Sequence, residues 1–159
     1  MEQKSLSKWL KLILLGMGIC GLAVYFLIVP SFGDSLRSQY PEFADRYWPW
    51  LIFIWVSGVP CYAVLALGWR IAVNIGRDES FSLANARCLG SIARLAAGDA
   101  AFVFLGNVAL LFLNMSHPGV VLLSLLVVFA GAAVAVAAAA LSHLVRKGAL
   151  LQEENDLTI

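Results

Sequence analysis

The sequence has little charge for its length, which excludes an ordinary soluble domain. Only 13% of its 159 residues are charged, whereas 61% are hydrophobic. Soluble domains usually have about a quarter charged residues and about half apolar ones. A core this small cannot hide the excess apolar surface from water, so we expect the lipid bilayer to surround most of the chain. The formal net charge of +1 gives no reason to expect direct nucleic-acid binding, which needs many phosphate-neutralising Lys and Arg residues.

Reactive cysteine patterns and the common catalytic motifs are also missing. The three cysteines, Cys20, Cys61 and Cys88, form no CxxC pair, so we expect neither a disulfide framework nor a zinc site. No HExxH, Walker loop, dinucleotide fingerprint or GxSxG elbow is present, and each of these motifs supports a specific chemistry. We therefore expect no enzyme activity, no metal and no cofactor.

Four apolar runs are each long enough to cross a bilayer, which takes about 20 residues of α-helix. The predicted spans are residues 9–29, 49–69, 95–114 and 120–143. They leave an outer loop at 30–48, a cytosolic loop at 70–94 and a cytosolic tail at 144–159. A cleaved signal peptide at 1–33 is the alternative for the first run, but its apolar stretch exceeds the usual 7 to 15 residues. The predicted fold is an all-α, polytopic membrane protein with a single membrane domain over residues 1–159.

The basic residues predict the orientation, because cytosolic flanks of membrane spans retain Lys and Arg. Only Arg37 and Arg46 fall on the predicted outer side. The other nine of the 11 basic residues fall on the predicted cytosolic side: Lys4, Lys8, Lys11, Arg70, Arg77, Arg87, Arg94, Arg146 and Lys147. This pattern predicts that both termini face the cytosol.

Several residues indicate local features of the helices. Pro60 removes a hydrogen bond inside the second span and predicts a kink near Val56, whose freed carbonyl Ser57 could satisfy. Ser82 is a candidate N-cap for a helix that begins before the third span. In the fourth span, Gly131, Ala135 and Ala139 repeat every four residues, the spacing of close helix contacts in membranes.

Asp99 and Asn107 are polar residues inside the third span. An ionisable side chain there costs about 3 kcal/mol on insertion scales and indicates a functional site by default. Asp99 has two interpretations: a buried carboxylate that joins helices through an arginine or His143, or a proton or cation site. The span holds no second carboxylate to form a relay. For Asn107 we expect a hydrogen bond between helices, to Ser57 or to another copy of the chain.

A catalytic triad of Ser142, His143 and Asp99 is not expected. Ser142 and His143 are sequence neighbours, so their side chains point about 100° apart on a helix. His143 is therefore a candidate intramembrane polar residue rather than a general base.

The C-terminal tail has a distinctive pattern. Leu144, Leu150 and Leu151 could continue an amphipathic helix, after which Glu153, Glu154 and Asp156 form an acidic patch around Asn155. The chain ends in Leu157, Thr158 and Ile159, apolar or β-branched residues that would fray into water at a free terminus. Two alternatives follow: the tail docks on the basic stretch Arg77–Arg94 of its own chain, or a partner binds it.

These residues resemble a bacterial membrane family catalogued as domain of unknown function 2975. The resemblance rests on Phe81 and Ser82 followed by Asn85 and Arg87 in the middle loop, and on the terminal sequence 151–159. It implies a four-span protein of the bacterial inner membrane, commonly encoded beside a short helix-turn-helix regulator of the Xre type. It implies no established activity.

Two functions are consistent with these observations. The first is a non-enzymatic regulatory membrane protein that binds such a regulator through Phe81, Ser82, Asn85, Arg87 and the tail residues Glu153, Glu154, Asn155, Asp156, Leu157, Thr158 and Ile159. The alternative is a small ion or solute transporter, for which we expect a homo-oligomer, or an immunity or stress protein that shields the membrane from a toxin.

Overall fold

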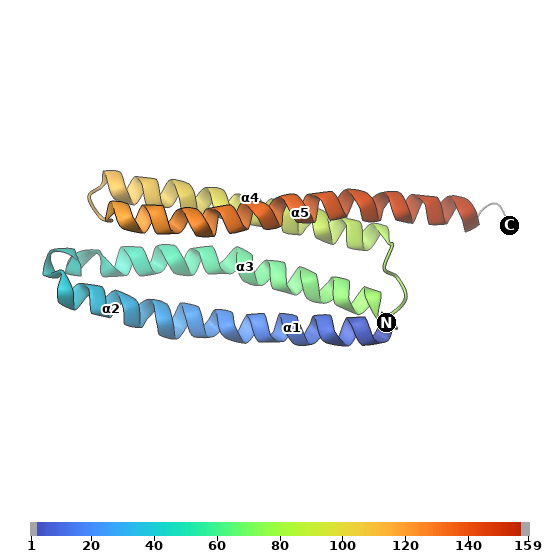
Figure 1. The fold of residues 1–159 in the computed structure, drawn as a ribbon, viewed down its shortest axis with the longest axis horizontal. Coiled ribbons are helices and arrows are strands. Elements are labelled where there is room, and N and C mark those ends of the chain that lie inside the picture. The colour runs from blue at the N-terminus through green and yellow to red at the C-terminus, as the bar shows by residue number, and fades with distance from the viewer. Residues whose placement is uncertain (1–2, 157–159) are drawn as a thin grey trace.

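The computed structural model describes residues 3–156, and this part of the chain is helical with no β-strand. Helix α1 (Gln3–Ala23) continues through the π-helical turn η1 (Val24–Ile28) into α2 (Val29–Gln39). The 3₁₀ turn η2 (Pro41–Arg46) leads to α3 (Tyr47–Ile75), α4 (Leu83–Phe112) and α5 (Pro118–Asp156). Figure 1 shows these helices as two long antiparallel hairpins lying side by side.

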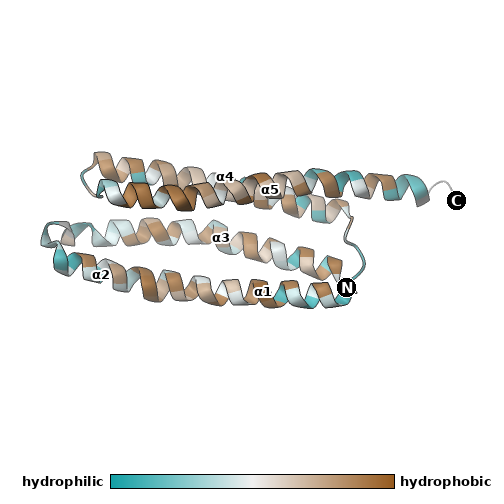
Figure 2. Cartoon of the chain, viewed as in Figure 1, coloured by the Kyte–Doolittle hydropathy of each residue, from teal (hydrophilic) through white to brown (hydrophobic). Residues whose placement is uncertain are grey.

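The structure confirms the four predicted membrane helices. Four helical segments are long and apolar enough to span a bilayer: Gln3–Gln39, Ala44–Ile75, Leu83–Phe112 and Pro118–Asn155. Large apolar side chains cover their outer surfaces, including Leu27, Phe129 and Val136. Hydrophobic residues dominate the middle of each helix, and polar residues gather at the two ends of the molecule (Figure 2).

Residues 30–48, which we predicted to be a loop, are mostly helical instead. Pro30 lies in the first turn of α2, a position where a missing N–H group costs little. The π-helical turn before it lets the chain continue, because the N–H of Val29 bonds the carbonyl of Val24. The apolar-to-polar change at Pro30 therefore marks a change of environment and not the end of a helix.

The α1–α3 hairpin is held by side chains that donate to backbone carbonyls of the partner helix. Ser7 Oγ donates to the Ala72 carbonyl at 2.6 Å, and the Tyr62 hydroxyl donates to the Gly18 carbonyl at 2.8 Å. Trp55 Nε1 donates to the Tyr25 carbonyl at 3.0 Å. In a π-helix, a carbonyl accepts from the N–H group five residues later. For the Tyr25 carbonyl that residue is Pro30, which has no N–H, so Trp55 supplies the missing donor.

Pro60 lies inside α3, and Figure 1 shows α3 changing direction near its middle. The predicted partner of the freed Val56 carbonyl was wrong, since Ser57 Oγ donates to the Ile54 carbonyl at 2.8 Å. A serine hydroxyl in a helix reaches a carbonyl three or four residues back in its own turn more readily than the one just before it.

The α4–α5 hairpin packs through small residues, as the sequence predicted. A Cβ atom on Gly131 would lie 3.2 Å from Cβ of Ala100, and Ala135, Ala138 and Ala149 are buried. Ala139, which we expected in this contact, is exposed. Alternating steps of four and three residues, from 131 to 135 to 138, keep one face toward the neighbouring helix better than steps of four alone.

The helices pack in chain order. α1 contacts α3, α3 contacts α4, and α4 contacts α5. Within residues 3–156, no close backbone contact joins α1 to α4 or α5, or α3 to α5. The α3–α4 contact therefore joins the two hairpins.

We predict that Gly106 cannot be replaced, whereas Gly98 on the same helix can. A Cβ atom on Gly106 would overlap the ring of Phe53 on α3, but a Cβ atom on Gly98 would meet nothing within 4 Å. Gly106→Ala should lower the free energy of unfolding by about 1–3 kcal/mol through overpacking, measured by denaturation in mixed micelles. Gly98→Ala is the matched control and should cause no loss. Equal effects of the two changes would contradict this packing.

Candidate functional site

The loop between α3 and α4 is held by two asparagines. Asn74 Nδ2 donates to Asn85 Oδ1 at 2.8 Å, and Asn85 Nδ2 donates to the carbonyls of Glu79 and Ser80 at 3.0 and 3.1 Å. Asp78 adopts the left-handed conformation, with φ of 64°, which aspartate tolerates better than most residues. The side chain of Asn85 is 1% exposed, so the loop is a fixed surface.

This network changes the interpretation of two predicted partner-binding residues. Ser82 is the N-cap of α4, as predicted, and its side chain accepts from the Asn85 N–H. Asn85 itself is buried, and both ends of its amide are bonded within the loop. The prediction that Asn85 contacts a partner was therefore wrong, because the residue is used to shape the loop.

Phe81 lies on the surface of the same loop and is 59% exposed. One edge of its ring packs on α5, where a Cβ atom on Gly148 would lie only 2.7 Å from Cδ1 of Phe81. Nearby, Ser142 Oγ donates to the Ala86 carbonyl at 2.7 Å. These contacts fix the last third of α5 against the loop, so Phe81 and α5 form one continuous surface.

The predicted tail is the end of α5 itself. The helix continues to Asp156, and Leu151 is 66% exposed, followed by exposed Gln152, Glu153, Glu154 and Asn155. Figure 1 shows this part of α5 projecting beyond the start of α4 and away from the loop. The acidic end of the helix therefore does not fold back along Arg77–Arg94. The remaining predicted residues, Leu157, Thr158 and Ile159, lie outside the described residues.

Arg87 does not share the surface of Phe81. It lines a cavity of about 530 Å³ between α3 and α4, together with Trp69, Arg70, Asn74, Cys88 and Ser91. Lys11 on α1 lies over the Trp69 ring, with Nζ 6.0 Å from the ring centroid. Aromatic and basic residues of this kind gather where a membrane helix meets the headgroups, so we expect this cavity at that level.

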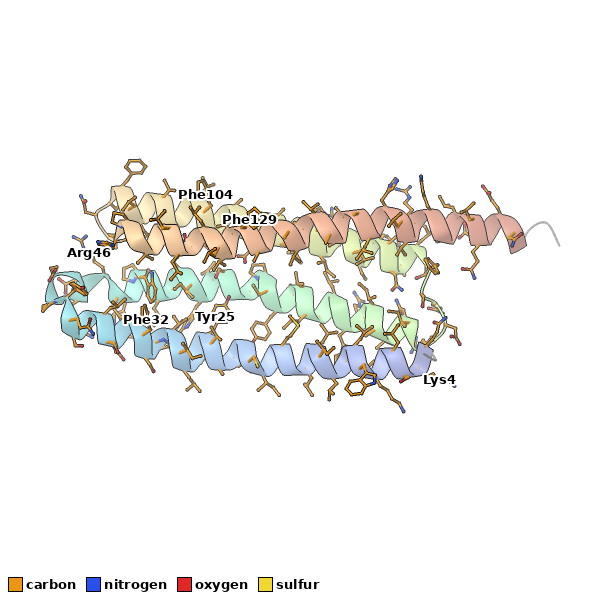
Figure 3. The ribbon with its side chains drawn as sticks, in the orientation of Figure 1. Lys4, Tyr25, Phe32, Arg46, Phe104 and Phe129 are labelled. Atoms are coloured by element: carbon orange, nitrogen blue, oxygen red, sulfur yellow. The ribbon has the colours of Figure 1, made fainter. Side chains whose placement is uncertain are left out.

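Asp99 is bonded to neither of its predicted partners. Its Oδ2 accepts from Cys61 Sγ on α3 at 3.6 Å, and Cys61 Sγ in turn accepts from the Tyr25 hydroxyl on η1 at 3.9 Å. Oδ1 of Asp99 is buried without a hydrogen-bond partner in the described part of the chain. Figure 3 shows Tyr25 midway along the first hairpin. The three groups form a weak polar chain across three helices, about 12 Å from Trp69 along α3.

The predicted hydrogen bond between Asn107 and Ser57 is not found in the described residues, and the position of His143 inside the membrane stays a prediction. Asn107 is 5% exposed, but its Nδ2 donates at 2.8 Å to the Val103 carbonyl of its own helix rather than to another helix. His143 is exposed on α5. Sequence spacing alone missed the Cys61–Asp99 contact, because it depends on the rotation of α3 relative to α4.

Comparison with known proteins identifies one family and one relative. A family model described as "Protein of unknown function (DUF2975)" matches residues 31–159. The chain is also 28% identical over 153 residues to "Uncharacterized membrane protein YoaS" of Bacillus subtilis (strain 168), an alignment that covers 95% of this chain and 96% of that protein. No solved structure matches.

We predict that Asn85→Ala opens the loop between α3 and α4. The change leaves the carbonyls of Glu79 and Ser80 and the Asn74 amide without their partner, which costs about 1–3 kcal/mol. Hydrogen exchange of the loop amides at residues 77–79 should then become about tenfold faster or more. Ser91→Ala, a polar truncation on the same helix, is the control and should leave these amides unchanged. Unchanged exchange in Asn85→Ala would show that the asparagine network does not hold the loop.

Proposed function

We propose that this chain, which belongs to the DUF2975 family of proteins of unknown function, is a non-enzymatic membrane protein that binds a small cytosolic helix-turn-helix regulator. The membrane is the bacterial inner membrane, and the bound surface faces the cytosol. Capture of the regulator removes it from DNA by mass action.

The main support is the projecting end of α5 beside Phe81. A helix of 39 residues is about 58 Å long, whereas the hydrocarbon core is about 30 Å thick. Part of α5 must therefore lie outside the hydrocarbon. That part carries exposed Leu151, and the exposed ring of Phe81 on the neighbouring loop packs on the same helix at Gly148. Exposed apolar side chains on a rigid element outside the lipid are typical of protein-binding surfaces.

The charge of this surface is consistent with a DNA-binding partner. Glu153, Glu154 and Asp156 place three carboxylates within four residues of the sequence. A helix-turn-helix protein uses basic residues to contact phosphates. An acidic helix end is complementary to that basic surface, so binding to α5 and binding to DNA would compete.

The polar chain Tyr25–Cys61–Asp99 favours a second candidate, proton or cation transport. An ionisable group in a membrane helix often marks an ion pathway, and the π-helical turn that holds Tyr25 is a feature frequent at functional sites. Asn107 does not extend this chain, since its amide donates within α4.

We predict that a helix-turn-helix protein co-purifies with the tagged chain from its own host in mild detergent. A chain that ends at Gln152, and a Phe81→Ser, Leu151→Ser double variant, should each retain at most about a tenth of that protein, since most of a binding energy comes from a few apolar anchors. Mass spectrometry and DNA binding by the captured protein are the measurements.

The control is Leu113→Ser, which removes an exposed leucine at the opposite end of α4 and should leave capture unchanged. A captured protein that binds equally to all variants, or one that binds no DNA, would contradict the proposal.

For the transport candidate, Asp99→Asn keeps the shape of the side chain and removes its charge. If transport is the function, proton or cation flux into liposomes should fall at least tenfold in Asp99→Asn, whereas Asn107→Leu should retain flux if it folds. Unmeasurable flux with the unaltered chain would exclude this candidate.

A further inference from the structure

A second cavity lies at the end of the molecule opposite the start of α1. It has a volume of about 470 Å³ and opens between the α2–η2 segment and the turn that joins α4 to α5. Figure 3 shows Arg46 between the two hairpins at this end, with Phe32 nearby. The volume lies within the range of small-molecule sites, about 300–1,000 Å³. The cavity exists because the hairpins are joined through α3 and α4 while α2 makes no close backbone contact with α4 or α5 among residues 3–156.

The walls of this cavity are largely apolar and aromatic. They comprise Phe32, Leu36, Tyr40, Tyr47, Trp50, Met115, Val120 and Leu123. Gly33 brings α2 close to α3 here, because a Cβ atom on it would lie 2.6 Å from the Tyr47 ring. The Tyr47 hydroxyl donates to the Pro30 carbonyl at 3.5 Å. Contacts with α2 thus fix the Tyr47 ring in the cavity wall. A wall of this composition suits the apolar part of a ligand.

The positive charge of this end is concentrated in the same cavity. Arg37 and Arg46 are the two basic residues that the sequence places away from the cytosolic side, and both line it. Three carboxylates share this end, Asp34, Glu42 and Asp45, but all three are exposed and none lines the cavity. Guanidinium groups bind carboxylate and phosphate groups through paired hydrogen bonds.

Two further polar groups line the cavity between α4 and α5. Oγ of Ser116 is buried and has no hydrogen-bond partner in the described part of the chain. The His117 Nδ1 accepts from the Gly119 N–H at 3.1 Å, so the neutral ring carries its proton on Nε2 and can donate there. A buried hydroxyl without a partner is costly, and a bound polar headgroup would supply one.

We propose that this cavity binds an amphipathic anion, with its apolar chain against the aromatic wall and its carboxylate or phosphate headgroup between Arg37, Arg46 and the Ser116–His117 turn. The anion comes either from a free fatty acid or from an anionic phospholipid, since both present this chemistry at the membrane surface. This site is separate from the regulator-binding surface proposed at the other end of α5.

Trp50 in the cavity wall provides a direct readout. The chain is placed in phosphatidylcholine nanodiscs and titrated with 9,10-dibromostearate, whose bromine atoms quench an indole on contact. A saturable loss of fluorescence is expected, and Trp50→Phe should remove it. Arg37→Gln should weaken the apparent affinity about tenfold, the usual cost of losing one charged hydrogen-bonding partner. Val120→Phe, which adds bulk to the wall without changing charge, should also weaken it.

Three controls make the test decisive. Arg77→Gln removes an exposed arginine at the other end of the molecule and should leave the titration unchanged. Dibromostearyl alcohol, which has the same chain without the charge, should bind at least tenfold more weakly. Nanodiscs that contain brominated phosphatidylglycerol distinguish the sources: Trp50 quenching there that unbrominated stearate cannot relieve identifies the phospholipid as the ligand. Equal binding of the alcohol and the acid, or no saturable quenching of Trp50 by either anion, would overturn the proposal.

Discussion

The structure depends on one constraint: a polar backbone group inside lipid must find its partner within the protein. Two prolines interrupt membrane helices, and the constraint explains what surrounds the first of them. The π-helical turn before Pro30 sets a five-residue spacing, in which Pro30 cannot donate to the Tyr25 carbonyl, and Trp55 donates from the neighbouring helix instead. The same requirement explains the buried Asn85, whose amide satisfies two loop carbonyls where α3 ends and α4 begins. A binding site can therefore use only those polar groups that these internal hydrogen bonds leave available.

The two hairpins meet this constraint in different ways, and the difference locates the candidate sites. In the α1–α3 hairpin, Ser7, Trp55 and Tyr62 donate to backbone carbonyls across the contact. In the α4–α5 hairpin, small residues bring the backbones together. The long, tightly held α5 contributes Val120 to the aromatic cavity and carries Leu151 at its other end. One uninterrupted helix thus connects the amphiphile site with the proposed regulator-binding surface.

The sequence predicted the parts of the fold that depend on composition and local chemistry. Four apolar runs predicted four membrane helices, Ser82 was identified as an N-cap, and small residues predicted the α4–α5 contact. The lengths of the helices were not predictable from hydropathy, because residues 34–39 and 144–156 are polar enough to lie outside lipid and still helical. The site was harder to predict. The burial of Asn85 and the Asp99–Cys61 contact depend on how α3 is rotated against α4, and the aromatic cavity combines segments about 80 residues apart. Neither the rotation nor the separation of the hairpins leaves a periodic pattern in one sequence.

The central claim is that Phe81 and the end of α5 face the cytosol while the aromatic cavity faces outward, and labelling of single cysteines tests it most directly. In a chain with Cys20, Cys61 and Cys88 replaced by serine, Glu153→Cys and Ser38→Cys introduce thiols at exposed positions near opposite ends of the molecule. A membrane-impermeant maleimide should label Ser38→Cys in intact spheroplasts, and Glu153→Cys only after the membrane is permeabilised. Labelling of Glu153→Cys in intact spheroplasts would place the acidic helix end outside the cell and contradict a cytosolic regulatory role.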